Sequence, residues 1–139
     1  MRYFLLFCFG FAISLYGNEK LVLISNKNFP LNSLVEGQIK QIYLKRMHFI
    51  KDMPIIPINY VARDPIRNYF EKSILNLSPK KLKKYWMKKH YEGKRPPLVQ
   101  SSIQSAIIFV KKVDGAVAYI PYSKIPKDIK ILYVSKERP

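Results

Sequence analysis

Cysteine is almost absent from this chain of 139 residues, and the single one is Cys8, inside an apolar run near the N-terminus. Residues 18–139 therefore carry no thiol, which excludes both a disulfide framework and a cysteine-ligated metal site in that part. Histidine is nearly as rare, and the nine acidic residues show no metal-ligand spacing. Because no set of nucleophile, base and acid is visible, we predict no catalytic residues, no enzyme activity, no metal and no cofactor.

Acidic side chains are scarce relative to basic ones: 25 Lys and Arg stand against 9 Asp and Glu, a formal net charge of +16. Such a surface attracts polyanions through its long-range field. Nucleic acid would be the first candidate in a cytosolic protein, but the N-terminal segment indicates export and argues against it. We instead expect a small anion such as phosphate, anionic lipid, an acidic glycan, or the acidic face of an envelope protein. A general lysine bias of the proteome is the alternative explanation.

The first 17 residues have the layout of a secretory signal peptide. Arg2 supplies a positive charge, residues 4–16 are almost wholly apolar, and polarity returns at Asn18. This apolar run is shorter than the roughly twenty residues that a membrane-spanning helix needs, so we expect cleavage, near Gly17, and no retained transmembrane helix. The chain is therefore divided into a signal peptide, residues 1–17, and a single domain, residues 18–139, with a periplasmic location.

Strand and helix signals alternate along residues 18–139. Apolar or alternating runs predict strands at residues 20–26, 54–60, 116–120 and 129–134. Favoured N-cap and first-turn residues predict helices that begin near Ser33, at Asp64-Pro65, at Ser78-Pro79, and at Ser101 or Ser102. Residues 47–54 are expected to be irregular, and the prolines of 54–60 place that strand at a sheet edge or confine its pairing to its middle. The pattern predicts an α/β fold with helices flanking a small, mixed, mostly parallel sheet.

The helix predicted over residues 78–90 is the most basic element. Its lysines are interleaved with Tyr85, Trp86 and Tyr91, a combination that can bind acidic polymers through charge and ring stacking. Tyr85 and Trp86 also fall at core spacing with Leu82, and we favour packing for these two rings. The lysines then form a basic face for anionic lipid or an acidic partner.

Several short motifs occur in an order and spacing that resemble a known family. They are Gln41-Ile42-Tyr43-Leu44, Arg67-Asn68-Tyr69-Phe70, Leu77-Ser78-Pro79 with Tyr85-Trp86, Gly93-Lys94-Arg95-Pro96-Pro97, and Gly115-Ala116-Val117-Ala118-Tyr119-Ile120. Together these motifs look like the phosphate ABC transporter substrate-binding protein family, in particular its short single-lobe members, over residues 20–134. The resemblance implies one type 2 periplasmic-binding-protein-like lobe, similar to the lobe inserted in the middle of the two-lobed members.

The resemblance also implies where phosphate would bind. In the family a Ser-Gly-Thr type turn at a helix N-terminus holds the oxyanion through backbone N–H groups and hydroxyls. The corresponding turn here is Arg63-Asp64-Pro65. Pro65 has no N–H to donate, and the Asp64 carboxylate would occupy the N-terminal donors and repel an anion. This departure puts phosphate binding by that turn in question.

Six residues are candidates for an anion-binding site: Ser25, Asn26, Arg63, Arg67, Ser101 and Ser102. The two arginines flank a helix start and could clamp an oxyanion. The alternative is that Arg63 is solvated and Arg67 pairs with Glu71, four residues further on. The other four residues end a strand or open a helix, where open α/β sheets present ligand-facing groups, although hydroxyls at such places are more often simple caps.

Two functions are compatible with these observations. The first is a solute-binding-like periplasmic domain whose cleft, formed by strand ends near Ser25, Arg63 and Ser101, contacts a small anion such as phosphate. The second is a lobe that has lost anion binding and acts as an adaptor or structural component of an envelope assembly, such as a transporter, a secretion complex or a flagellar motor. The Asp64-Pro65 sequence favours the second, as does the expectation that a lone lobe cannot enclose a ligand from both sides.

Overall fold

The computed structural model describes residues 19–136, so the predicted signal peptide lies outside the described part. The strands are β1 (Leu21–Ser25), β2 (Phe49–Ile50), β3 (Met53–Pro54), β4 (Ile56–Tyr60), β5 (Leu98–Gln100), β6 (Ala116–Pro121) and β7 (Lys130–Val134). The helices are α1 (Glu36–Tyr43), α2 (Pro65–Phe70), the π-helical η2 (Glu71–Leu75), α3 (Pro79–Tyr91), α4 (Ile103–Lys112) and the short η3 (Tyr122–Lys124). Within residues 19–136, no helix has the length and apolar character needed to cross a membrane.

Five strands form one sheet in the order β5-β4-β6-β1-β7. β4 is parallel to both β5 and β6, whereas β1 is antiparallel to both β6 and β7. Four strands therefore run in one direction and β1 alone runs in the other. The prediction of an α/β fold with a mixed, mostly parallel sheet is confirmed.

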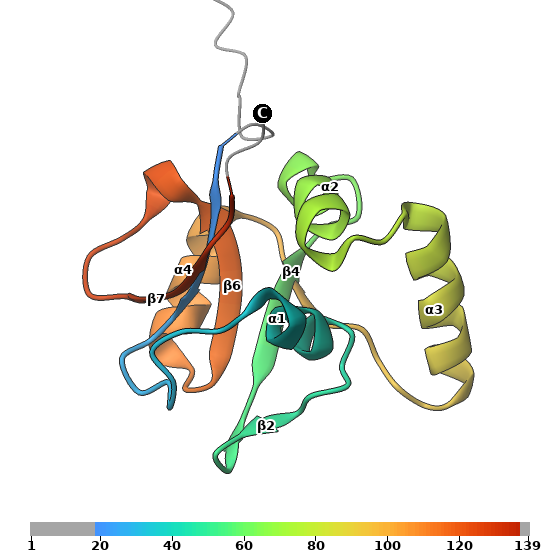
Figure 1. Cartoon of the computed structure of the whole chain (residues 1–139), viewed down its shortest axis with the longest axis horizontal. Coiled ribbons are helices and arrows are strands. Elements are labelled where there is room, and N and C mark those ends of the chain that lie inside the picture. The colour runs from blue at the N-terminus through green and yellow to red at the C-terminus, as the bar shows by residue number, and fades with distance from the viewer. Residues whose placement is uncertain (1–18, 137–139) are drawn as a thin grey trace, which may run out of the picture.

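Helices cover both faces of this sheet (Figure 1). The chain goes from β4 to β5 through α2, η2 and α3, and α1 and α2 lie in front of the sheet in this view. It goes from β5 to β6 through α4, which lies behind the sheet and packs mainly on β6. The crossover from β4 to β5 and the crossover from β5 to β6 run in opposite directions across the sheet. Because such crossovers are right-handed, their helices must lie on opposite faces of the sheet.

Four buried aromatic side chains occupy the centre of the core: Tyr43, Tyr60, Phe70 and Tyr119. The rings of Phe70 and Tyr119 are stacked with their centroids 3.8 Å apart. Each phenol is hydrogen-bonded: Tyr43 donates to the Ile58 carbonyl at 2.9 Å, Tyr60 donates to the Tyr119 carbonyl at 2.8 Å, and Tyr119 donates to the Asn59 side chain. Burial raises the pKa of all three phenols above the ordinary value near 10, so they stay protonated and neutral in the fold.

The prolines of residues 54–60 do not place that strand at an edge, because β4 lies between β5 and β6. The Ile56 N–H donates to the Gly115 carbonyl next to β6, at 2.9 Å. Successive residues of a strand direct their N–H groups to opposite neighbouring strands, so the N–H that Pro57 lacks would have pointed toward β5. β5 begins only opposite Ile58, so no ladder bond is lost there.

Two further expectations about local structure were wrong. α1 does not begin at Ser33: its N-cap is Val35, whose N–H donates to the Gln38 side chain at 2.9 Å. The reason is that the Leu34 N–H donates to the Leu132 carbonyl at 2.9 Å, which keeps the chain extended beside β7. Residues 47–54 are also not irregular throughout, since β2 and β3 pair as an antiparallel hairpin.

Candidate functional site

The carboxyl ends of β4 and β5 lie side by side, because Tyr60 is paired with Gln100. The chain leaves β4 for α2 in front of the sheet, and it leaves β5 for α4 behind it (Figure 1). Two neighbouring parallel strands whose connections depart to opposite faces form a switch point, which is where open α/β sheets bind ligands. We refer to this end of β4 and β5 as the switch-point edge.

Three of the predicted site residues lie at the switch-point edge. Arg63 follows β4 by three residues, and its side chain is exposed. Ser101 follows β5 directly and is exposed as well. Ser102 is the N-cap of α4, where its hydroxyl accepts a hydrogen bond from the Ser105 N–H at 3.0 Å. The structure thus brings a cation and two hydroxyls to one edge, one of the hydroxyls being used as a helix cap.

The N-terminus of α2, at the same edge, is closed by its own residues. An Asp64 side-chain oxygen accepts a hydrogen bond from the Ile66 N–H at 3.0 Å. Pro65 is the first residue of the helix and has no N–H. An anion approaching this helix end would meet a carboxylate in place of free N–H donors.

Arg67 is engaged within the fold. Its Nε lies 3.2 Å from a carboxylate oxygen of Glu71, and its Nη1 donates to the Tyr60 carbonyl at 2.8 Å. Arg67 therefore ties α2 to the last residue of β4, in agreement with the alternative of a pair with Glu71.

Ser25 and Asn26 lie at the opposite end of the sheet from Arg63 and Ser101, because β1 is antiparallel to β6. Ser25 is fully buried, and its hydroxyl donates to the carbonyl of the next residue at 3.3 Å. The Asn26 amide donates to Asp114 in the turn before β6, at 2.8 Å. The prediction of one cleft near Ser25, Arg63 and Ser101 is therefore wrong, since it assumed that β1 runs in the same direction as β4.

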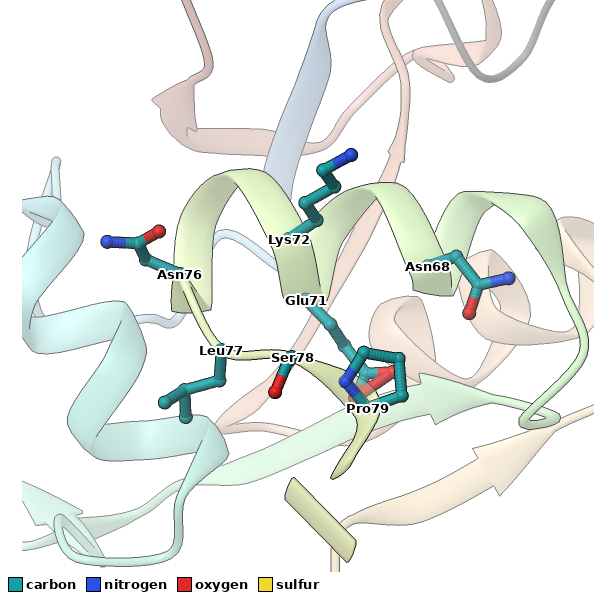
Figure 2. A pocket seen from close by; sticks show the side chains of 7 residues that line it. All are labelled: Asn68, Glu71, Lys72, Asn76, Leu77, Ser78 and Pro79. Atoms are coloured by element: carbon teal, nitrogen blue, oxygen red, sulfur yellow. The ribbon is translucent and has the colours of Figure 1, made fainter. Parts of the chain in front are cut away.

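A hollow of about 490 Å³ lies between η2 and the start of α3 (Figure 2). Its lining residues are Asn68, Glu71, Lys72, Asn76, Leu77, Ser78 and Pro79. Figure 2 shows Glu71 extending toward Pro79, whereas Lys72 leaves the helix on another side. Glu71 is paired with Arg67, and Lys72 also lines the hollow, so its lining carries charges of both signs. The sequence pattern does not reveal this hollow, because its shape depends on the turn at Asn76, whose backbone is left-handed with φ of 53°.

The architecture is that of one lobe of a periplasmic-binding-protein-like protein, with a small mixed sheet flanked by helices. No family model matches the sequence, and no curated protein matches it.

Solved structures of phosphate receptors share this fold. A crystal structure of an ABC-type phosphate transport receptor from Vibrio cholerae matches with a TM-score of 0.66 and 19% identity, over 82% of this chain and 45% of that chain. A protein from Clostridium perfringens, described as a phosphate ABC transporter substrate-binding protein and solved with bound phosphate, matches with a TM-score of 0.67 and 19% identity, over 82% of this chain and 44% of that one. PstS from Borrelia burgdorferi matches with a TM-score of 0.65 and 18% identity, over 87% and 49%. The chain thus spans less than half the length of these structures, and the likeness shows the fold.

Proposed function

We propose that residues 18–139 form a non-enzymatic adaptor lobe of the bacterial envelope, exported through a cleaved signal peptide at residues 1–17. In this proposal a phosphate-receptor type of lobe docks on a protein of an envelope assembly instead of closing on an anion. The observation that carries it is the self-capped N-terminus of α2, with Asp64 on the Ile66 N–H at 3.0 Å and Pro65 in the first turn.

The electrostatics of that helix end support the loss of anion binding. A helix N-terminus attracts an anion through its free N–H groups and the positive end of its dipole. Asp64 accepts from one of those groups and places a negative charge where the oxyanion would lie. The nearby Arg67 is paired with Glu71, so its charge is already balanced.

The switch-point edge also offers features suited to a protein partner. Val61, directly after β4, is 48% exposed, and Leu98 and Val99 on β5 are 53% and 51% exposed. β5 is an edge strand of the sheet, and an edge strand can pair with an extended segment of a partner. Exposed apolar side chains together with an exposed arginine are a common composition of protein interfaces.

A small-anion site is the second candidate function, and it is favoured by the exposed Arg63 and Ser101, which both lie at the switch-point edge. The similarity in fold to the Clostridium perfringens protein solved with bound phosphate also supports a small-anion site. In this alternative the oxyanion would be held from the α4 side of the switch-point edge, away from Asp64.

Calorimetric titration of the exported protein with inorganic phosphate separates the two candidates. The adaptor proposal predicts no heat of binding at micromolar phosphate, together with co-purification of a stoichiometric envelope protein. The double variant Asp64→Ser, Pro65→Gly should gain phosphate affinity, because it restores donors at α2 and removes the carboxylate. Lys112→Ala, which removes one exposed cation elsewhere, should change neither result. Micromolar binding by the unaltered protein that Arg63→Ala abolishes would overturn the adaptor proposal.

A further inference from the structure

α3 stands at the side of the molecule, at the far end from β7 (Figure 1). Leu82 is its one buried residue. Tyr85 attaches the helix to the body, because its hydroxyl donates to the Leu44 carbonyl at 2.7 Å. Arg46 and Lys89 also lie over its ring, at 5.3 Å and 5.4 Å from the centroid. This agrees with the packing role expected for Tyr85.

The side of α3 opposite Leu82 combines cations with exposed apolar groups. At about 100° per residue, positions 80, 84, 87 and 91 fall on that side, with positions 83 and 88 at its borders. Met87 is 54% exposed and Tyr91 is 86% exposed. We call this surface the α3 outer face: Lys80, Lys83, Lys84, Met87, Lys88 and Tyr91.

The charge of the α3 outer face is not balanced within the described fold. No acidic residue occurs between positions 76 and 91. The adjacent Glu92 is already engaged by Lys89 at 3.2 Å and by Lys94 at 3.8 Å, and the hydrogen bond from Lys89 lowers its pKa. Within residues 19–136, Lys80, Lys83 and Lys84 form no ion pair. Like charges three and four residues apart destabilise a helix slightly, and an external anionic surface would relieve this repulsion.

We propose that the α3 outer face docks on an anionic lipid surface, with the lysines over phosphodiester head groups and with Met87 and Tyr91 in the interfacial layer. All cations of the face are lysines. Lysine acts as a hydrated point charge suited to a diffuse negative surface, whereas bidentate recognition of protein carboxylates favours arginine. Tyrosine has an apolar ring and a polar hydroxyl, which suits it to the membrane–water interface. This inference goes beyond the proposed adaptor function and does not depend on the state of the switch-point edge.

Vesicle binding by the exported protein tests the proposal. The protein should co-sediment with phosphatidylcholine vesicles that contain about a quarter phosphatidylglycerol, and not with pure phosphatidylcholine, because the lysines sense the anionic surface potential. Added salt should release the protein, because salt screens the attraction between the lysines and the lipid head groups.

A matched pair of variants separates the α3 outer face from net charge. Replacing Lys80, Lys83, Lys84 and Lys88 by Gln should weaken binding by about two to three orders of magnitude, since each lysine near an anionic surface contributes roughly fivefold. The control replaces four exposed lysines far from α3 by Gln: Lys111, Lys112, Lys124 and Lys127. It has the same net charge as the first variant and should bind within about threefold of the unaltered protein. Circular dichroism should show both variants folded.

Three outcomes would overturn the proposal. They are equal loss of binding in both variants, no binding to phosphatidylglycerol vesicles, and binding to immobilised polyglutamate without binding to vesicles, which would identify an acidic protein as the partner. The result of the vesicle experiment does not determine the result of the phosphate titration, so either proposal can fail without the other.

Discussion

α3 and α4 start with the same chemistry but belong to the molecule in different ways. Ser78 caps α3 by accepting from the Lys81 N–H at 3.2 Å, and Ser102 caps α4 by accepting from the Ser105 N–H at 3.0 Å. α4 lies along the sheet and buries Ala106 and Val110 completely, whereas α3 buries Leu82 alone.

The difference shows that a cap decides where a helix begins, while the apolar stripe decides whether the helix is part of the core. The sheet with α1, α2 and α4 forms a packed body, and α3 is attached to it through Leu82 and the Tyr85 hydrogen bond. We expect the body to account for most of the unfolding free energy. We expect α3 to open locally more often than the body does.

The strongest test of the comparison is a charge placed on each helix. Val110→Asp buries an unpaired carboxylate at a fully buried position of α4 and should lower the unfolding free energy by about 4 kcal/mol or more. Lys84→Asp, at an exposed position of α3, should change it by less than about 0.5 kcal/mol. Urea unfolding followed by circular dichroism measures both, and a comparable loss in the two variants would contradict the division into body and attached helix.

High pH should act on the body through three buried phenols whose pKa is raised in the fold: Tyr43, Tyr60 and Tyr119. Their pKa values are raised in the fold, so their stabilising effect is complete below pH 10 and is lost as the pH rises further. Above pH 10 the unfolded chain releases protons that the fold retains, and stability should fall by about 1.4 kcal/mol per pH unit for each phenol. Urea midpoints between pH 9 and 11 measure this slope.

The control for the pH effect is a tyrosine on α3. Tyr91→Phe removes a phenol that is 86% exposed, and it should leave the slope unchanged. Tyr43→Phe removes a buried phenol and should reduce the slope by about a third. The same slope in both variants would mean that general lysine titration, and not the buried cluster, causes the loss.

Leu82→Ala should separate α3 from the body. Truncating a buried leucine costs about 2 to 4 kcal/mol, and here we expect that cost to appear as undocking of α3. Backbone amides of α3 should then exchange with solvent at least tenfold faster, while those of β1 and β6 stay as protected as before. Leu132→Ala, at a buried position of β7, should speed exchange throughout the body, and the same pattern in both variants would contradict a separate α3.

The two serine caps should give the smallest effects. Ser102→Ala removes the cap of α4 and should lower the global unfolding free energy by about 1 kcal/mol. Ser78→Ala removes the equivalent hydrogen bond from α3 and should fray its first turn with little global change. Urea midpoints together with Trp86 emission distinguish the two results.

Local interactions were the part of the fold that could be predicted from sequence. The starts of α2, α3 and α4 were correct because each cap bonds an N–H two or three residues away, so every participant lies within a few positions. The start of α1 was missed because a bond from Leu34 to Leu132 overrides the local signal at Ser33. β5 was missed as well, since its three residues are a strand only because β4 lies beside them.

The candidate site was predictable to the same extent. The pair between Arg67 and Glu71 follows from their i, i+4 spacing and was foreseen as an alternative. Arg67 also donates a hydrogen bond to the Tyr60 carbonyl at 2.8 Å. This bond depends on how α2 packs against β4, and residue spacing in the sequence does not predict that packing.

The amino-acid sequence by itself determined the starts of α2, α3 and α4, the closure of the α2 N-terminus by Asp64 and Pro65, and the concentration of lysines on α3. Only the tertiary structure decided the direction of β1, which takes Ser25 and Asn26 away from Arg63 and Ser101. A short apolar strand that is covered on both faces is hydrophobic in either orientation. Its direction is set by its partners, β6 and β7, which lie about a hundred residues further along the chain.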